Sequence, residues 1–189
     1  GIPSDTTYID MAQNKLLTNE SLQINAGPLE KITFQGGYSD YKHSEKTPAG
    51  TVVSTFLNKE LDGRAEAIFG GIGPFSSSAL GLQFNNRRFS ALGAASNYML
   101  PTLTQTYAGY VFTEVPLGAR LNLQAAGRVE SVGISGTPAS NIVTTRQFIP
   151  LSASAGLLWD ATDKLKLGLT LTSAARAPGQ TELFARGGH

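Results

Sequence analysis

The sequence contains no cysteine and only two histidines in 189 residues. Disulfides and thiolate metal sites are therefore excluded, and there is little histidine for acid–base or metal chemistry. No stretch approaches the roughly 18 consecutive apolar residues of a transmembrane helix, so any membrane-spanning part of this chain must consist of strands. Lys and Arg (15) balance Asp and Glu (14) without forming a basic stripe, which argues against nucleic acid as a partner.

Charged residues are also scarce, at 15% of the chain, against about 25% in soluble domains. Glycine is abundant, with 21 residues in 189, whereas its usual share is about 7%. Low charge and high glycine content suit a sheet that meets apolar surroundings. Neither a Ser-His-acid arrangement nor a Gly-Lys phosphate motif is present, so the sequence predicts no enzymatic activity.

The chain does have long runs in which apolar and polar residues alternate. In residues 119–130, Leu121 and Leu123 share one face while Arg120 and Arg128 share the other. This run is longer than the roughly 5 or 6 residues of a typical soluble strand, and about 9 to 11 residues cross a bilayer as a tilted strand. Similar alternation recurs in residues 32–39, 57–69, 149–159 and 164–172.

These runs and the Gly, Pro and Asp residues between them predict eight strands. The strands are expected near residues 18–26, 31–41, 51–69, 76–89, 102–114, 119–134, 148–159 and 164–175. Short connections at 27–30, 70–75, 115–118 and 160–163 alternate with long ones at 42–50, 90–101, 135–147 and from 176 onward. Outer-membrane barrels have short periplasmic turns and long extracellular loops. The predicted fold is therefore all-β, an antiparallel transmembrane β-barrel segment.

Three local details follow from the same pattern. Trp159 lies beside a short turn, which places it at the periplasmic aromatic girdle. In residues 102–114 two sets of side chains compete for the apolar face, so the register of that strand stays open. Residues 1–17 show no period and are expected to lead in from a loop or a preceding strand.

A family resemblance appears after the last predicted strand. Residues 175–178 read Ala-Arg-Ala-Pro and residues 182–184 read Glu-Leu-Phe. Together they resemble the RAP…ELF signature in the barrel domain of TonB-dependent outer-membrane receptors. Three further stretches, residues 37–45, 55–58 and 62–66, are similar to the zinc- and haem-type branch of that family. The resemblance covers residues 9–184.

The resemblance implies uptake across the outer membrane of a Gram-negative bacterium, in contact with its lipid. Such receptors bind scarce ligands outside and import them with energy from the TonB complex. Zinc, haem or a siderophore would be the transported ligand, with no resident cofactor. The complete fold is a 22-stranded barrel around a plug. No plug or coupling box precedes Gly1, and the end at His189 lacks the terminal aromatic of a finished barrel. Residues 1–189 are therefore expected to be a partial barrel.

A candidate metal site lies near the predicted outer rim. Continued alternation puts Tyr41, His43 and Glu45 on the lumen side. Residues two apart on a strand are about 7 Å apart, and zinc accepts both imidazole nitrogen and carboxylate oxygen. His43 and Glu45 could thus share a metal with a third ligand from elsewhere. The alternative is a solvated rim histidine hydrogen-bonded to a neighbour.

A set of charged residues is predicted to line the lumen. These residues contact substrate or plug, or they form a wall of mutually paired charges against water; an aqueous lumen tolerates either. The set is Glu60, Asp62, Arg64, Glu66, Arg120, Arg128 and Glu130. Arg176 lies where the last strand leaves the membrane, and is either a strand-end residue or a ligand contact.

Two other interpretations of the whole chain remain open at this stage. One is a complete small eight-stranded outer-membrane barrel with an adhesion or structural role, because the strands near 18–26 and 164–175 are antiparallel and could close. The other is a soluble all-β binding domain.

Overall fold

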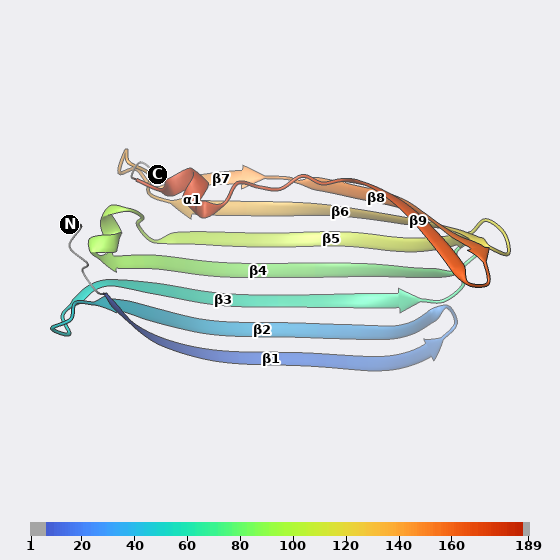
Figure 1. Cartoon of the computed structure of the whole chain (residues 1–189), viewed down its shortest axis with the longest axis horizontal. Coiled ribbons are helices and arrows are strands. Elements are labelled where there is room, and N and C mark those ends of the chain that lie inside the picture. The colour runs from blue at the N-terminus through green and yellow to red at the C-terminus, as the bar shows by residue number, and fades with distance from the viewer. Residues whose placement is uncertain (1–6, 187–189) are drawn as a thin grey trace.

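Residues 7–186 are described by a computed structural model, and within them nine strands form one antiparallel sheet (Figure 1). The strands are β1 (Tyr8–Ala26), β2 (Leu29–Lys46), β3 (Val52–Phe69), β4 (Ser77–Gly93), β5 (Thr102–Pro116), β6 (Leu121–Gly136), β7 (Thr144–Phe148), β8 (Leu151–Thr162) and β9 (Leu165–Ser173). Two short helices, η1 (Ala94–Asn97) and α1 (Gln180–Phe184), lie outside the sheet. No helix in this range is long and apolar enough to cross a membrane.

The sheet order follows the chain from β1 to β6 and continues with β8 and β9, while β7 pairs with the last residues of β6. We call the end with connections 47–51, 94–101 and 137–143 the outer end, on the left in Figure 1. The opposite end, with the connections 27–28 and 163–164, is the inner end.

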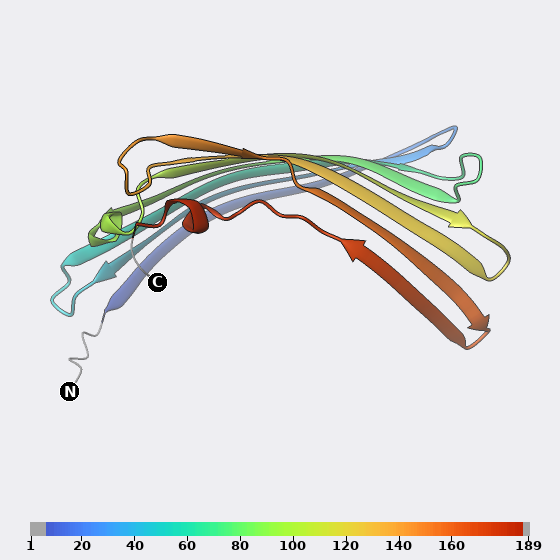
Figure 2. The ribbon, with the colours of Figure 1, turned by 90° about the horizontal axis from the view of Figure 1, so that it is seen from above.

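The sheet is curved, and its two faces differ in chemistry. Figure 2 shows an arch with α1 beneath it, on the concave side. The convex face carries leucines such as Leu169 and Leu171, which are 64% and 71% exposed because nothing in the described chain covers them. The concave face carries Arg128 and Glu130. The antiparallel sheet confirms the predicted barrel fold, and the exposed leucines and the paired charges lie on opposite faces of it.

Of the strands that are longer at the outer end than predicted, β1 and β2 extend the farthest. β1 begins at Tyr8, so residues 8–17, which show no period in the sequence, belong to a strand. Asp10 and Asn14 share the convex face with Leu16 and hide the alternation there. β2 continues to Lys46, so the long connection expected over residues 42–50 is a turn of residues 47–51. Residues 1–6 lie outside the described residues.

Two features of the sequence explain these differences. In the outer part of β1, Ile9 and Met11 face the concave side while Asp10 lies on the convex side, so the apolar residues change face along the strand. In the outer part of β2, polar and charged residues from Lys42 to Lys46 occupy both faces and resemble a loop. The backbone ladder is nevertheless continuous from Tyr8 opposite Lys46 to Gln23 opposite Lys31.

The region predicted as one strand near residues 148–159 is two strands. Phe148 pairs with Val132 and Leu151 pairs with Val129, so β7 and β8 follow β6 in the same register. Pro150 interrupts them because it has no N–H to donate to the ladder. Its carbonyl oxygen still accepts from the Glu130 N–H at 3.0 Å.

The open register of residues 102–114 is now defined. In β5, Tyr110 lies opposite Arg128 and Val111 lies opposite Gly127. Tyr110 therefore faces the concave side and Val111 the convex side. Trp159 lies near the inner end, opposite Leu121, and is half exposed.

Candidate functional site on the concave face

Charged residues of β3 and a tyrosine of β5 meet in the middle of the concave face. Arg64 forms an ion pair with Glu66, with 2.7 Å between Nη2 and Oε2. The Arg64 Nε also donates to the Tyr110 hydroxyl at 2.5 Å, and that hydroxyl donates to Glu66 Oε2 at 2.7 Å. Tyr110 reaches across Gly81, where an added Cβ would lie 2.0 Å from the ring carbon Cζ. The absence of a side chain at Gly81 therefore makes the three-residue contact sterically possible.

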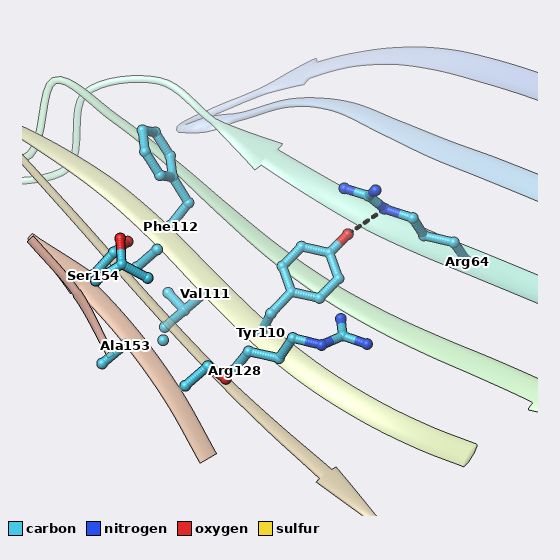
Figure 3. Close-up of a pocket in the computed structure, with 11 residues that line it drawn as sticks. Arg64, Tyr110, Val111, Phe112, Arg128, Ala153 and Ser154 are labelled. Atoms are coloured by element: carbon cyan, nitrogen blue, oxygen red, sulfur yellow. Dashed lines mark hydrogen bonds between the residues drawn. The ribbon is translucent and has the colours of Figure 1, made fainter. Parts of the chain in front are cut away.

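The same tyrosine contacts a second ion pair, on β6. Arg128 Nε donates to Glu130 Oε1 at 2.6 Å. The guanidinium carbons of Arg64 and Arg128 lie 4.9 and 5.9 Å from the centre of the Tyr110 ring, within cation–π range. Figure 3 shows the Tyr110 hydroxyl directed at Arg64, with Arg128 beside the ring. We call Arg64, Glu66, Tyr110, Arg128 and Glu130 the Tyr110 cluster.

Charge within the Tyr110 cluster is balanced, because two guanidiniums meet two carboxylates and each carboxylate has a cationic partner. The sequence left two alternatives for these residues, contact with substrate or plug and a wall of mutually paired charges. This geometry has the form of the paired charges. An open cleft of about 300 Å³ adjoins it, lined on the concave side by Tyr110, Phe112 and Arg128 together with serines of β8.

The remaining members of the predicted lumen set are spread along the wall. Glu60 accepts from Asn85 Nδ2 at 2.6 Å. Asp62 lies beside Gly37, where a Cβ would be 2.2 Å from Oδ2. Arg120 is at the inner end and pairs with the exposed Asp163 at 3.1 Å. The structure thus places Arg64, Glu66, Arg128 and Glu130 together, and places Glu60, Asp62 and Arg120 elsewhere.

A second group, of aromatic rings, lies at the outer end. The His43 ring stacks on Phe56 with 4.5 Å between centres and 24° between planes. Tyr41 meets His43 edge-on at 5.6 Å, and Phe89 lies 6.3 Å from Phe56. These four residues, from β2, β3 and β4, form what we call the aromatic ladder.

The imidazole of the aromatic ladder is incompletely partnered. His43 Nδ1 is buried and has no hydrogen-bond partner within residues 7–186. Glu45 follows on the same face of β2, opposite Ser54. The described part of the chain contains no group of three His, Cys, Asp or Glu residues that could hold a metal ion. A zinc site on His43 and Glu45 therefore needs a ligand from outside this range.

Comparison with known proteins identifies the family. Residues 5–189 match the family described as "TonB dependent receptor-like, beta-barrel". The chain belongs to this family. A solved structure titled "Copper transporter OprC" is similar to this chain, with a TM-score of 0.70 and 16% sequence identity. The similarity covers 93% of this chain and 32% of the solved one, so this chain spans about a third of that protein's length. No curated protein matches the sequence.

The RAP…ELF motif of this chain folds back on itself. Arg176 makes two hydrogen bonds to the Glu182 carboxylate, at 2.9 and 2.8 Å, and the Gly179 N–H donates to the same carboxylate. These hydrogen bonds lower the pKa of Glu182 to about 2, and those from Arg176 have the larger effect. Arg176, predicted as a strand-end or ligand residue, thus has a partner within its own motif.

Beyond this clasp, the segment attaches to the sheet and to two outer connections. Phe184 is 2% exposed and packs on Val132 and Ile134 of β6. The Arg186 N–H donates to the Tyr98 carbonyl at 2.8 Å, and its guanidinium donates to the Pro138 carbonyl at 2.9 Å. We call residues 174–186 the strap. It connects the 94–101 and 137–143 connections across the concave face.

Sequence reasoning missed Phe56, Phe89 and Tyr110, which connect the groups it did find. Only Tyr110 could be noticed from the sequence, because it belongs to residues 102–114, where two sets of side chains compete for the apolar face. Phe56 and Phe89 acquire a role only through pairing, since His43 lies opposite Phe56 in the ladder of β2 and β3.

Proposed function

We propose that this chain forms part of the wall of an outer-membrane receptor that imports a metal complex, either haem or a siderophore, with energy from the TonB complex. Membership of the receptor family supports transport in general. The aromatic ladder supports the choice of a complex carried by an organic ligand.

The carrying observation is the His43–Phe56 stack on the concave face at the outer end. Flat rings offer an apolar surface on which the planar or aromatic part of a ligand stacks, and such ring pairs add about 0.5 to 1.5 kcal/mol beyond area burial. Nδ1 of His43 is buried there without a partner in the described chain, so ligand binding that turns the ring and gives this atom a hydrogen bond is favoured. A ligand with both a ring and a polar or metal-binding group fits this pair of features.

A metal complex is favoured over a bare zinc ion by the ligand count. Structural zinc sites take four protein ligands and catalytic ones three. Residues 7–186 offer His43 and Glu45 without a third residue of a suitable type nearby. A complex arrives with most of its coordination already filled, so one imidazole is a sufficient contribution from the wall.

We also propose that the sheet continues in further strands and that a plug domain couples it to the TonB complex. Within residues 7–186, β1 and β9 are the opposite edges of an open sheet and do not pair. Unpaired strand edges are costly in hydrocarbon. Continuation of the sheet satisfies both edges, which favours a partial barrel over closure as a small eight-stranded one.

Titration of the purified intact receptor with haem, a ferric catecholate complex and Zn²⁺ chloride tests the proposal. We expect saturable binding of haem or the ferric complex, and about tenfold weaker binding in His43→Ala, because one ring contact and one polar contact are lost. Arg120→Ala, at the inner end, is the control and should bind normally. Saturable binding of Zn²⁺ alone that needs His43 would replace this function with zinc uptake. A receptor that binds none of the three probes would overturn the proposal.

A further inference from the structure

The convex face carries a cationic patch at one end only. Within the strands of the described chain, the basic residues of this face all belong to the outer halves of β2, β3 and β4. They are Lys42, Lys46, Lys59 and Arg88, which we call the rim patch. The basic residues of the other strands, such as Arg128, face the concave side.

The rim patch lies at the outer side of the apolar belt. Leu57 and Leu103 lie within the patch, opposite Lys42 and Arg88. Tyr38 and Leu61, directly opposite each other and 40% and 49% exposed, form a row of the belt next to the patch. Two residues farther out, Asp40 lies opposite Lys59, and Lys59 lies opposite Arg88. In a membrane-spanning wall, this row is at the depth of the lipid headgroups, because aromatic and then charged residues follow the hydrocarbon band.

Charge in the rim patch is only partly compensated by the protein. Lys59 pairs with Asp40 at 3.0 Å, and Lys46 pairs with Asp10. Lys42 and Arg88 are exposed and form no hydrogen bond or ion pair within residues 7–186. Like charges directly opposite on neighbouring strands, as at Lys59 and Arg88, destabilise a sheet. An anion above this row offsets that repulsion.

A recess in the same patch provides a place for such an anion. A cleft of about 230 Å³ is lined by Lys42, Lys46 and Ser44, with Asp10 at its β1 side. Ser44 is 6% exposed, and its hydroxyl is 3.0 Å from the Thr55 hydroxyl. Lys and Arg bind phosphate oxygens through charge-assisted hydrogen bonds, and hydroxyls complete such sites.

We propose that the rim patch binds the phosphorylated headgroup of a lipid in the outer leaflet. The inference rests on the membrane placement contained in the proposed function. The long side chains of Lys42 and Arg88 extend along the wall with their charges at the headgroup level, as basic residues do at membrane interfaces. The apolar belt beneath, from Phe34 to Leu82, holds the acyl chains of the same lipid.

The test compares two double variants of the intact receptor in detergent. The patch variant is Lys42→Gln with Arg88→Gln, and the control is Lys164→Gln with Lys166→Gln, which removes the same charge at the inner end. Binding of a phosphorylated glycolipid and of its dephosphorylated form is measured by native mass spectrometry. We expect wild type and control to prefer the phosphorylated lipid, and the patch variant to bind it about tenfold more weakly, since two charge-assisted contacts are lost.

Equal phosphorylated-lipid binding by the patch variant and the control would overturn the inference, as would wild-type binding that ignores the phosphate. Capture of an acidic soluble protein at the patch, with no phosphate preference among lipids, would reassign it to a protein partner. Metal-complex titration of the same preparations separates this result from the proposed function, because neither double variant alters the aromatic ladder. Recovery of the receptor in the soluble fraction without detergent would instead overturn the membrane placement itself.

Discussion

The concave face contains two clusters that differ in how completely their polar groups are satisfied. In the Tyr110 cluster both carboxylates accept from guanidiniums, and the tyrosine hydroxyl both donates and accepts. In the aromatic ladder the rings contact one another, while His43 Nδ1 is buried without a partner. The first cluster is complete without a ligand, and the second is not.

Whether the polar groups already have partners distinguishes structural residues from ligand-binding residues more clearly than residue type does. Charged residues in a lumen are obvious candidates for ligand contacts. Arg64 and Arg128, however, already have hydrogen-bond acceptors on their own strands. A ligand would have to displace those bonds before it gained any. His43 Nδ1 has no hydrogen bond within residues 7–186 to displace, and because a buried polar atom without a partner is unfavourable, a ligand that turns the ring and pairs with this nitrogen relieves that cost.

The largest expected effect comes from filling the space under Tyr110. Gly81→Ala places a Cβ 2.0 Å from the tyrosine Cζ, so the ring must leave and its two hydroxyl hydrogen bonds are lost. We expect the free energy of unfolding to fall by about 1 to 3 kcal/mol, measured by urea unfolding in detergent. Gly109→Ala is the matched control, because its Cβ meets Leu82 at an ordinary 3.8 Å. Equal stability of the two variants would show that the Tyr110 cluster holds little of the wall together.

A pair of aromatic substitutions sharpens the contrast between stability and binding. Tyr110→Phe should lower the free energy of unfolding by about 0.5 to 1.5 kcal/mol, since one hydroxyl with two partners is removed, and should leave affinity for the metal complex unchanged. Phe56→Ala should weaken that affinity about tenfold, because His43 loses its stacking partner. Urea unfolding and ligand titration are run on both variants. A loss of affinity in Tyr110→Phe but not in Phe56→Ala would assign ligand binding to the Tyr110 cluster instead of the aromatic ladder.

Much of the fold is already present in the sequence, because alternation is a local property. Leu121 and Arg120 reveal their faces from their neighbours alone, and the RAP…ELF motif can be read directly. What the sequence hides depends on register. The stack of His43 on Phe56 and the reach of Tyr110 over Gly81 join residues 13 and 29 positions apart, which are neighbours only because β2, β3, β4 and β5 pair as they do. The outer part of β1 was missed because Asp10 and Asn14 interrupt the apolar face.

The smallest expected effect concerns the strap. Like those of the Tyr110 cluster, its charged groups have partners within the chain. Hydrogen bonds from Arg176 and Gly179 lower the pKa of Glu182 from 4.5 to about 2. A carboxyl whose pKa is lower in the folded state stabilises that state above its unfolded pKa, and this contribution is lost as the pH falls. The strap should therefore loosen between about pH 4.5 and pH 2, where Glu182 becomes protonated.

Hydrogen exchange at the Leu183 and Ala185 amides, which donate to the Gly179 and Thr181 carbonyls, reports the loosening. In Glu182→Gln the exchange should already be fast at neutral pH and should lose this pH dependence. Protection that stays unchanged in the variant would mean that Phe184, packed on Val132 and Ile134, holds the strap without the clasp.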